Sequence, residues 1–281
     1  MNSIYYNENT GDLEIPLDIL SKGISYAAKK KLHNIKIVSP IKKSNDKLDL
    51  SPLTENDNIH SLHIIDDIDL KKIDLSPLYE MKNIKKITMK YLKGSIDFSK
   101  FQKLETLYIT KADAEIDILN IDTLVDLLLV SIKNTNCEFI SSLRSLNTLR
   151  ISSVSIETLS GIELLSNLKS LKITYSPNVI DISSINKIKT LSYLHVEKCK
   201  KLTEFSFLRD NESICDLFLS DVDSLSFIPE MKSIKNLKFW NLKDGDLSYL
   251  LNSSTLKTVD FHPDKKSYSH RKDEINKKIG K

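Results

Sequence analysis

The chain has 281 residues, of which 40% are hydrophobic and 28% are charged, and its formal net charge is +3. This is the composition of a soluble folded protein, and no apolar run approaches the roughly 20 residues needed to cross a bilayer. Three cysteines are too few and too scattered for a disulfide framework or a zinc ribbon, and six glycines leave little material for phosphate-binding loops. The composition favours a binding protein over an enzyme.

Residues 1–31 are expected to cap the structure that follows. The amino terminus has neither the basic stretch nor the apolar stretch of a secretory signal, and free cysteines suit a reducing compartment, so we expect a cytoplasmic protein. The heavy use of Lys, Ile and Asn is typical of an AT-rich, bacterial coding sequence. Pro16 suits the first position of a helix, and Leu17, Leu20 and Ile24 would then lie on one face of that helix.

From residue 32 to residue 262 the pattern apolar-x-x-apolar-x-apolar recurs eleven times. Most copies begin about 22 residues apart, and the first two steps, of 27 and 25 residues, are long enough to contain insertions. Each copy predicts one short strand, and because a single repeat cannot bury its own apolar edge, the repeats must stack. The copies begin at Leu32, Ile59, Ile84, Leu104, Leu124, Leu146, Leu168, Leu191, Ile214, Ile234 and Leu256.

A second motif, x-apolar-Ser-x-apolar, recurs between the predicted strands. Its apolar residues are three apart, which favours a 3₁₀ or loosely helical turn. The polar residue at the head of the motif can cap this turn by accepting a backbone N–H. These predicted caps are Asp49, Asp74, Asp181, Glu204, Ser224 and Asp246.

The two motifs together resemble a leucine-rich repeat array of the bacterial internalin-like class, most clearly over residues 156–173. The resemblance implies an α/β solenoid, a leucine-rich repeat horseshoe with parallel strands on its concave face and short 3₁₀ or loop turns on its convex face. Internalins are exported, and without a signal that biology is not carried over. The family's asparagine three residues after the strand is absent, so we expect a drier interior there. Its positions hold Ala112, Ile132, Val154, Ser176, Cys199, Val222 and Leu242.

Residues 263–281 are expected to form a basic carboxyl-terminal cap or tail, with a short helix around Lys272 to Lys278. Between Asp264 and Lys281 there are seven cationic residues and three anionic ones. This charge is compatible with nucleic acid or an acidic protein as a partner, but a solvated cap is the simpler interpretation.

Strand alternation predicts which side chains leave the core. If Leu107 and Ile109 face inward, then Tyr108 faces the open strand surface, and the same rule applies to every copy. On three consecutive strands the rule exposes aromatic residues beside a histidine and a lysine, which suit a protein-binding anchor. This first candidate site comprises Tyr193, His195, Phe218, Lys238 and Trp240, and the anions predicted on the same face include Glu197, Asp216 and Asp260.

A second candidate cluster comprises Tyr108 with Leu128 and Val130, and Arg150 adds a cation to the same face. The alternative for all these residues is that they are ordinary exposed side chains without a function. If they form a contact surface, alanine at Trp240 or Phe218 should weaken partner binding and barely change thermal stability.

The sequence indicates neither a metal site nor a catalytic centre, and no cofactor is expected. None of the six histidines lies in a metal-binding spacing. Cys199 is expected to be a small buried filler, while His195 belongs to the strand face, so a Cys–His catalytic pair is not predicted. Carboxylate pairs such as Asp66 and Asp67 suit a solvated turn better than a calcium site.

The sequence therefore predicts a monomeric, non-catalytic solenoid that binds one protein partner with its concave face. Mixed charges on that face do not favour nucleic acid, and no membrane partner is expected. The bare repeat array is similar to cytoplasmic immunity or antitoxin proteins of bacterial competition systems, whose partner would be a toxin domain. Two alternatives are a leucine-rich repeat effector enzyme, for which the flanking segments are short, and a surface adhesin or adaptor.

Overall fold

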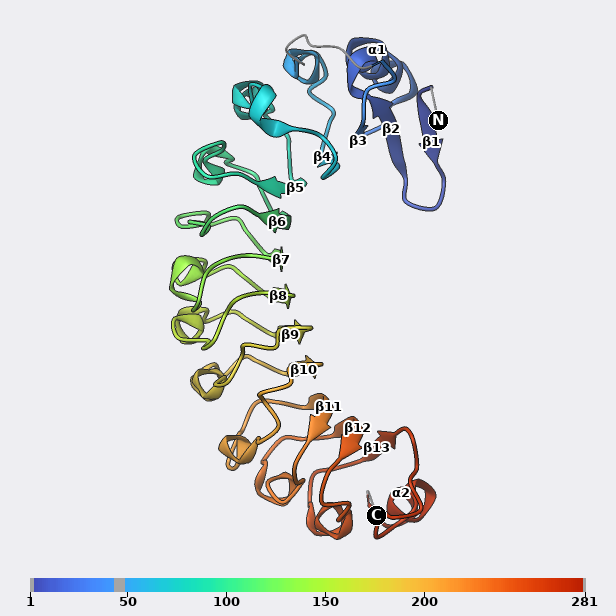
Figure 1. Cartoon of the computed structure of the whole chain (residues 1–281), viewed down its shortest axis with the longest axis vertical. Helices are drawn as coiled ribbons and strands as arrows, with labels where there is room; N and C mark the ends of the chain where they lie inside the picture. Colours follow the sequence, from blue (N-terminus) through green and yellow to red (C-terminus); the bar gives the residue numbers. More distant parts are fainter. Residues whose placement is uncertain (1–2, 43–48, 280–281) are drawn as a thin grey trace. The chain divides into compact units, whose positions relative to one another are not determined.

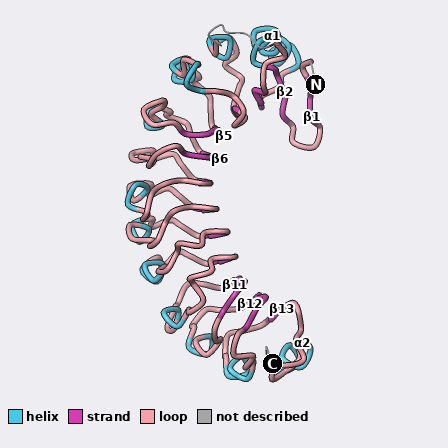
Figure 2. The backbone as a smooth tube through the Cα atoms, viewed as in Figure 1, coloured by secondary structure: helices cyan, strands magenta, loops and turns pink. Residues whose placement is uncertain are grey.

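The computed structural model describes residues 3–42 and 49–279. The chain divides into two compact units, Met1–Lys133 and Asn134–Lys281. Within each unit, short strands line one side of the coil, and 3₁₀ turns and loops line the other (Figures 1 and 2). We call the outward-pointing side chains of the strands in each unit its strand face. Among the described residues, no helix combines the length and the apolar character that a membrane crossing requires.

In the first unit, strands β2 to β7 pair in parallel and in chain order, so each repeat adds one strand to the sheet. The bounds are β1 (Tyr5–Asn7), β2 (Asp12–Pro16), α1 (Leu20–Lys30), β3 (Asn34–Val38), β4 (Ser61–Ile64), β5 (Lys86–Tyr91), β6 (Thr106–Ala112) and β7 (Asp126–Val130).

The first unit opens with a hairpin that the repeat motif did not predict. Strand β1 pairs antiparallel with β2, and β2 pairs in parallel with β3, which places Leu13 beside Ile35 in the core. Gly11, at φ 72°, supplies the left-handed turn just before β2. The predicted helix is present as α1, but it begins at Leu20 and not at Pro16, which ends β2 and precedes a short 3₁₀ turn over Leu17–Ile19. Strand β2 therefore covers the open edge of β3, and α1 packs against β2 and the 3₁₀ turn over Ser51–Glu55.

The second unit continues the same construction. Strands β8 to β13 pair in parallel and in chain order. The bounds are β8 (Thr148–Ser152), β9 (Ser170–Thr174), β10 (Tyr193–Glu197), β11 (Asp216–Val222), β12 (Asn236–Leu242), β13 (Thr258–Phe261) and α2 (Lys272–Lys278).

These elements confirm the predicted leucine-rich repeat solenoid, because each of the eleven motif copies forms one strand from β3 to β13. The inward residues are sealed from water: Leu107 and Ile109 in the first unit and Leu171 and Ile173 in the second have exposed fractions of 0%. Burial of one such side chain contributes about 1.5–3 kcal/mol. Stacked columns of these side chains therefore form the core of each unit.

The predicted turn caps are also confirmed. The backbone N–H of Ser183 donates to Asp181 over 2.8 Å, and the N–H of Ser248 donates to Asp246 over 2.9 Å. The side-chain and backbone hydrogen bonds from Ser248 lower the pKa of Asp246. The remaining predicted caps, which accept in the same way, are Asp49, Asp74, Glu204 and Ser224.

The residues that replace the family's asparagine are all buried, as expected. Ser176 takes over part of the missing hydrogen bonding, because its hydroxyl donates to the carbonyl of Thr174 over 2.9 Å and accepts from the N–H of Val154 over 3.4 Å. Cys199 is 3% exposed, and burial raises the pKa of its thiol to about 11. It is therefore the buried filler that the repeat predicted.

The two long repeat steps differ in what the structure shows of them. The second step contains an additional 3₁₀ turn, Leu70–Lys72. The Asp69 side chain caps this turn by accepting a hydrogen bond from the backbone N–H of Lys71. The first contains residues 43–48, so its expected insertion lies partly outside the described residues.

The carboxyl-terminal segment closes the open edge of β13. Helix α2 spans the residues expected for it, and its Ile275 is buried. The Asn276 side chain accepts from the N–H of Val259 over 2.9 Å and donates to the carbonyl of the same residue over 2.8 Å. The side chain thus satisfies backbone groups that an edge strand would otherwise leave unpaired.

Candidate functional site

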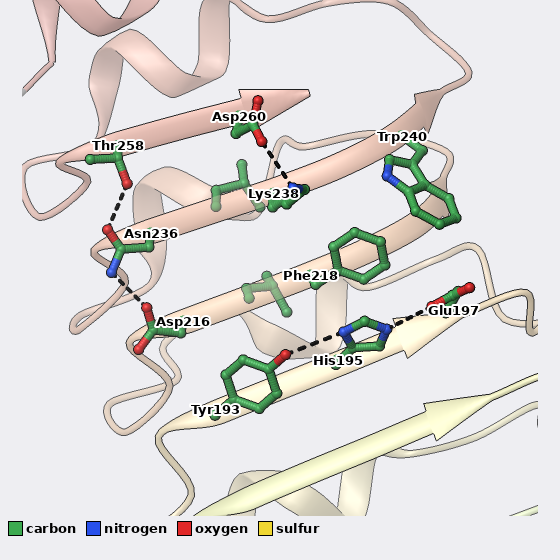
Figure 3. A pocket seen from close by; sticks show the side chains of 12 residues that line it. Tyr193, His195, Glu197, Asp216, Phe218, Asn236, Lys238, Trp240, Thr258 and Asp260 are labelled. Atoms are coloured by element: carbon green, nitrogen blue, oxygen red, sulfur yellow. Dashed lines mark hydrogen bonds and ion pairs between the residues drawn. The ribbon is translucent and has the colours of Figure 1, made fainter. Parts of the chain in front are cut away.

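A hollow of ≈ 530 Å³ opens on the strand face of the second unit, across β10 to β13 (Figure 3). All five residues of the first candidate site line it, because the parallel register places them in adjacent rows. His195, Phe218 and Lys238 lie side by side in one row, and Tyr193 and Trp240 flank that row. The remaining lining residues are Glu197, Asp216, Leu217, Asn236, Leu237, Thr258 and Asp260.

The floor of the hollow is a continuous run of ring contacts. His195 stacks on Phe218 with ring centroids 4.2 Å apart and planes at 21°. Trp240 meets Phe218 nearly edge-on, with centroids 5.0 Å apart and planes at 85°. Neighbouring strands are about 4.8 Å apart, so rings at matching positions of consecutive strands come into contact.

This packing corrects the expectation that Phe218 and His195 would be exposed. Phe218 is only 7% exposed and His195 only 9%, because each ring is covered by its neighbours. Tyr193 remains 37% exposed, and Trp240 is half-buried. Phe218 therefore forms the floor while Tyr193 and Trp240 form the walls, and alanine at Phe218 will cost stability as well as contact area.

A hydrogen-bonded chain runs along β10. The Tyr193 hydroxyl lies 3.3 Å from His195 Nδ1, and His195 Nε2 lies 3.0 Å from a carboxylate oxygen of Glu197. Burial lowers the pKa of His195, although the hydrogen bond to Glu197 partly opposes this effect. A neutral imidazole fits both contacts, because its Nε2–H donates to Glu197 and its Nδ1 accepts from Tyr193. Burial raises the pKa of Tyr193, which keeps that hydroxyl protonated.

The carboxylates of the hollow have unlike partners. Asp260 lies 3.0 Å from both Lys238 Nζ and Lys272 Nζ, and the hydrogen bonds from these two ammonium groups lower its pKa. Asp216, in contrast, accepts from the neutral amide of Asn236 over 2.6 Å. The amide oxygen of Asn236 in turn accepts from the hydroxyl of Thr258 over 2.6 Å (Figure 3).

The second candidate cluster lies on the strand face of the first unit. Tyr108 and Leu128 are register partners on β6 and β7. The Lys86 ammonium lies 4.8 Å from the centroid of the Tyr108 ring, and the Tyr108 hydroxyl donates to Asp126 over 2.7 Å. Both the ring and the hydroxyl of Tyr108 therefore already have partners within the first unit.

Arg150 is also separate from the hollow. It lies on β8, where its register partner is Lys172 of β9, and it is half-buried. Its position two strands before His195 explains why it does not line the hollow.

Alternation had placed Glu197, Asp216 and Asp260 on this face without assigning them to the site. Their contribution follows only from the register, which sets each carboxylate beside a particular ring or amide. The polar residues Asn236 and Thr258 line the hollow although no sequence motif pointed to them. The strand position relative to Phe218 locates all five of these lining residues, which are Glu197, Asp216, Asn236, Thr258 and Asp260.

The described residues contain no metal-binding group, and Cys199 and His195 contact different partners. Among residues 3–42 and 49–279, no three His, Cys, Asp or Glu side chains are grouped so as to hold a metal ion. The Cys199 sulfur lies 3.6 Å from the carbonyl oxygen of Glu197 and 3.9 Å from that of Ile173, so it faces backbone on the inner side of the repeat. His195 bonds to Tyr193 and Glu197 instead.

Comparison with known proteins identifies the fold. No family model matches the chain, and no curated protein matches it. A leucine-rich repeat protein from Leptospira interrogans is 15% identical, with a TM-score of 0.56 over 92% of this chain and 76% of that one. The TLR13-ssRNA13 complex is 16% identical, with a TM-score of 0.58 over 89% of this chain and 42% of that one. Internalin C2 from Listeria monocytogenes is 18% identical, with a TM-score of 0.47 over 66% of this chain and 83% of that one. The chain has the leucine-rich repeat fold.

Proposed function

We propose that this chain is a protein-binding module and that the hollow of the second unit is its main contact site. The observation that carries the proposal is the grouping of Tyr193 and Trp240 around a buried Phe218 on three adjacent strands. Tyrosine and tryptophan dominate the energetics of protein interfaces when they surround a packed pocket. Because the rings rest on strands rather than on loops, little conformational entropy is lost on binding.

Nucleic acid is the less favoured partner, although one structure with the same fold is an RNA complex. The hollow is lined by three carboxylates, those of Glu197, Asp216 and Asp260, and by a single lysine, Lys238. That lysine is already paired with Asp260. A phosphate backbone entering the hollow would meet net negative charge, which opposes binding.

Substitution of Trp240 by alanine tests the proposal. With a partner captured by the wild-type chain and then purified, Trp240→Ala should weaken binding by more than ~2 kcal/mol, measured by calorimetry. Tyr175→Ala is the matched control, because Tyr175 is an exposed aromatic residue of the same unit, 49% exposed, that does not line the hollow. Equal losses for the two variants, or no loss for Trp240→Ala, would contradict the proposal.

We propose further that the protein is cytoplasmic and bacterial, and that its partner is a toxin domain which it neutralises. The free cysteines support a reducing compartment, since Cys137 and Cys199 are both buried thiols. Co-expression with the products of neighbouring genes tests the toxin proposal: a stoichiometric complex that relieves toxicity supports it, and the absence of any such effect rejects it. Detection of the protein in the envelope or the culture medium would favour an adhesin instead.

A further inference from the structure

We infer that the hollow receives an arginine side chain of the partner, held against the aromatic rings and paired with the carboxylate of Glu197. This inference rests on the proposed function and names the chemistry of the group that enters the site. It makes the partner surface a basic one and the recognition a combination of stacking and charge.

The unequal pairing of the carboxylates is the first argument. Lys238 and Lys272 both serve Asp260, each at 3.0 Å. Asp216 and Glu197 are held by uncharged groups instead, the amide of Asn236 at 2.6 Å and the imidazole of His195 at 3.0 Å. Both carboxylates thus have hydrogen-bond donors without a neutralising cation in those bonds. Asp216 lies opposite Tyr193, whereas Glu197 lies four residues further along β10, so a single guanidinium reaches only one of the two.

The degree of burial makes this charge effective. The Glu197 side chain is only 14% exposed and its partner His195 only 11%. Burial lowers the pKa of His195, so the imidazole does not become the missing cation at neutral pH. An ion pair formed in such a poorly hydrated place is screened less by salt than one on an open surface.

The aromatic walls are the second argument. A cation is attracted to the face of Trp, Tyr or Phe within about 6 Å of the ring centre, and the indole face is the strongest of the three. Trp240 lies at the same end of the hollow as Glu197, and Phe218 lies between that end and Asp216 (Figure 3). A planar guanidinium can stack on a ring while its N–H groups fork onto a carboxylate, which an ammonium group cannot do. The lining therefore suits arginine better than lysine.

The test uses Trp240 as the reporter, because it is the only tryptophan in the chain. The full chain is titrated with N-acetyl-arginine methylamide while the indole fluorescence is recorded. The matched probes are the citrulline derivative, which replaces the guanidinium by a neutral urea of the same shape, and the leucine derivative, which is apolar. We expect a saturable change with the arginine probe and a Kd about tenfold higher, or more, for the citrulline probe.

Two variants assign the charge to its residues. Glu197→Gln keeps the side-chain shape and should raise the Kd of the arginine probe about tenfold, whereas Asp216→Asn, at the opposite end of the hollow, should change it much less. Asp210→Asn is the control: this carboxylate belongs to the same unit, pairs with Lys232 at 3.2 Å and does not line the hollow. It should leave the Kd unchanged. A thermal melt of each variant, followed by circular dichroism, checks that the fold is retained.

Each other outcome overturns the inference. If the citrulline or leucine probe binds as tightly as the arginine probe, the hollow takes a neutral side chain, and the proposed protein-binding function stands without the arginine. If no probe changes the emission, or if Glu197→Gln does not raise the Kd, the hollow is not an arginine site. The proposed function fails separately, when Trp240→Ala leaves partner binding intact.

Discussion

The strand faces of the two units are built by the same alternation and yet differ in what they offer to a partner. On the first unit, Tyr108 is covered on its ring by Lys86 and bonded through its hydroxyl to Asp126. On the second unit, rings on three consecutive strands contact one another around a hollow of ≈ 530 Å³. The isolated Tyr108 ring contacts charged neighbours on its own strand face, whereas the rings on adjacent strands of the second unit pack against one another and line a hollow.

The difference arises from neighbours and not from residue type. Tyr108 has an aliphatic register partner, Leu128, while Phe218 has His195 on one side and Lys238 on the other, with Trp240 nearby. The spacing of about 4.8 Å between strands turns such a sequence of residues into stacked rings. The strand residues on either side of Tyr108 and of Phe218 are buried aliphatic residues in both units, Leu107 and Ile109 in the first and Leu217 and Leu219 in the second, so the contrast arises on the strand face.

The largest effect is expected from the shared core. Leu171→Ala in the second unit and Leu127→Ala in the first should each lower the free energy of unfolding by ~2–5 kcal/mol, because both leucines are 0% exposed in stacked columns. Urea unfolding followed by circular dichroism measures both. A loss in only one of the two variants would show that the units do not share one type of core.

Phe218→Ala sharpens the distinction between floor and wall. Since Phe218 is 7% exposed and lies between His195 and Trp240, its truncation should cost ~2–4 kcal/mol of stability in addition to binding. Tyr108→Ala, at a half-buried ring on the first unit, should cost less. Phe218→Leu should recover part of the loss. If Phe218→Ala had the same free energy of unfolding as the wild-type chain, the Phe218 ring would line the side of the hollow, as Trp240 does, rather than its floor.

The turn caps should respond alike in the two units. Asp74→Ala and Asp246→Ala should each cost ~1 kcal/mol, because each aspartate accepts from a serine N–H at 2.9 Å at the start of a 3₁₀ turn. Asparagine at either position keeps an acceptor and should lose less. Thermal unfolding of the four variants measures the effect, and an alanine variant as stable as its asparagine counterpart would deny the cap a role.

The smallest effect is a pH dependence that both units share. Burial lowers the pKa of His195, with Lys172 adding to the shift and Glu197 opposing it, and burial also lowers the pKa of His63 in the first unit, with Lys36 adding to that shift. The unfolded chain then binds protons near the usual value of 6.5 that the folded chain does not, so stability falls as the pH drops below 6.5 and is complete above it.

Urea unfolding at several pH values between neutrality and mild acid measures this dependence. His195→Gln and His63→Gln should each flatten the pH profile relative to the wild-type chain, because each removes one group that protonates only on unfolding. A steeper profile in either variant would mean that the histidine gains stability, rather than losing it, when it is protonated.

The fold could be predicted from the sequence because the residue pattern that specifies it is local and repeated. Apolar residues such as Leu171 and Ile173 mark each strand, and residues such as Asp181 mark each turn. The amino-terminal hairpin was missed because β1 and β2 fall outside the repeat, and their pairing depends on a turn at Gly11 rather than on periodicity. Strand alternation identified the candidate aromatic residues, but it did not predict that His195 and Phe218 are buried.

By itself, the sequence determined the repeat, the strand alternation and the set of side chains that leave the core, since all three follow from spacing along the chain. Only the tertiary structure decided that His195 and Phe218 are buried, that Asp260 takes both nearby lysines, and that Asp216 is bonded to a neutral amide. The physical reason is that these properties depend on which side chains of neighbouring strands meet. The parallel register between residues some 20 positions apart sets those meetings.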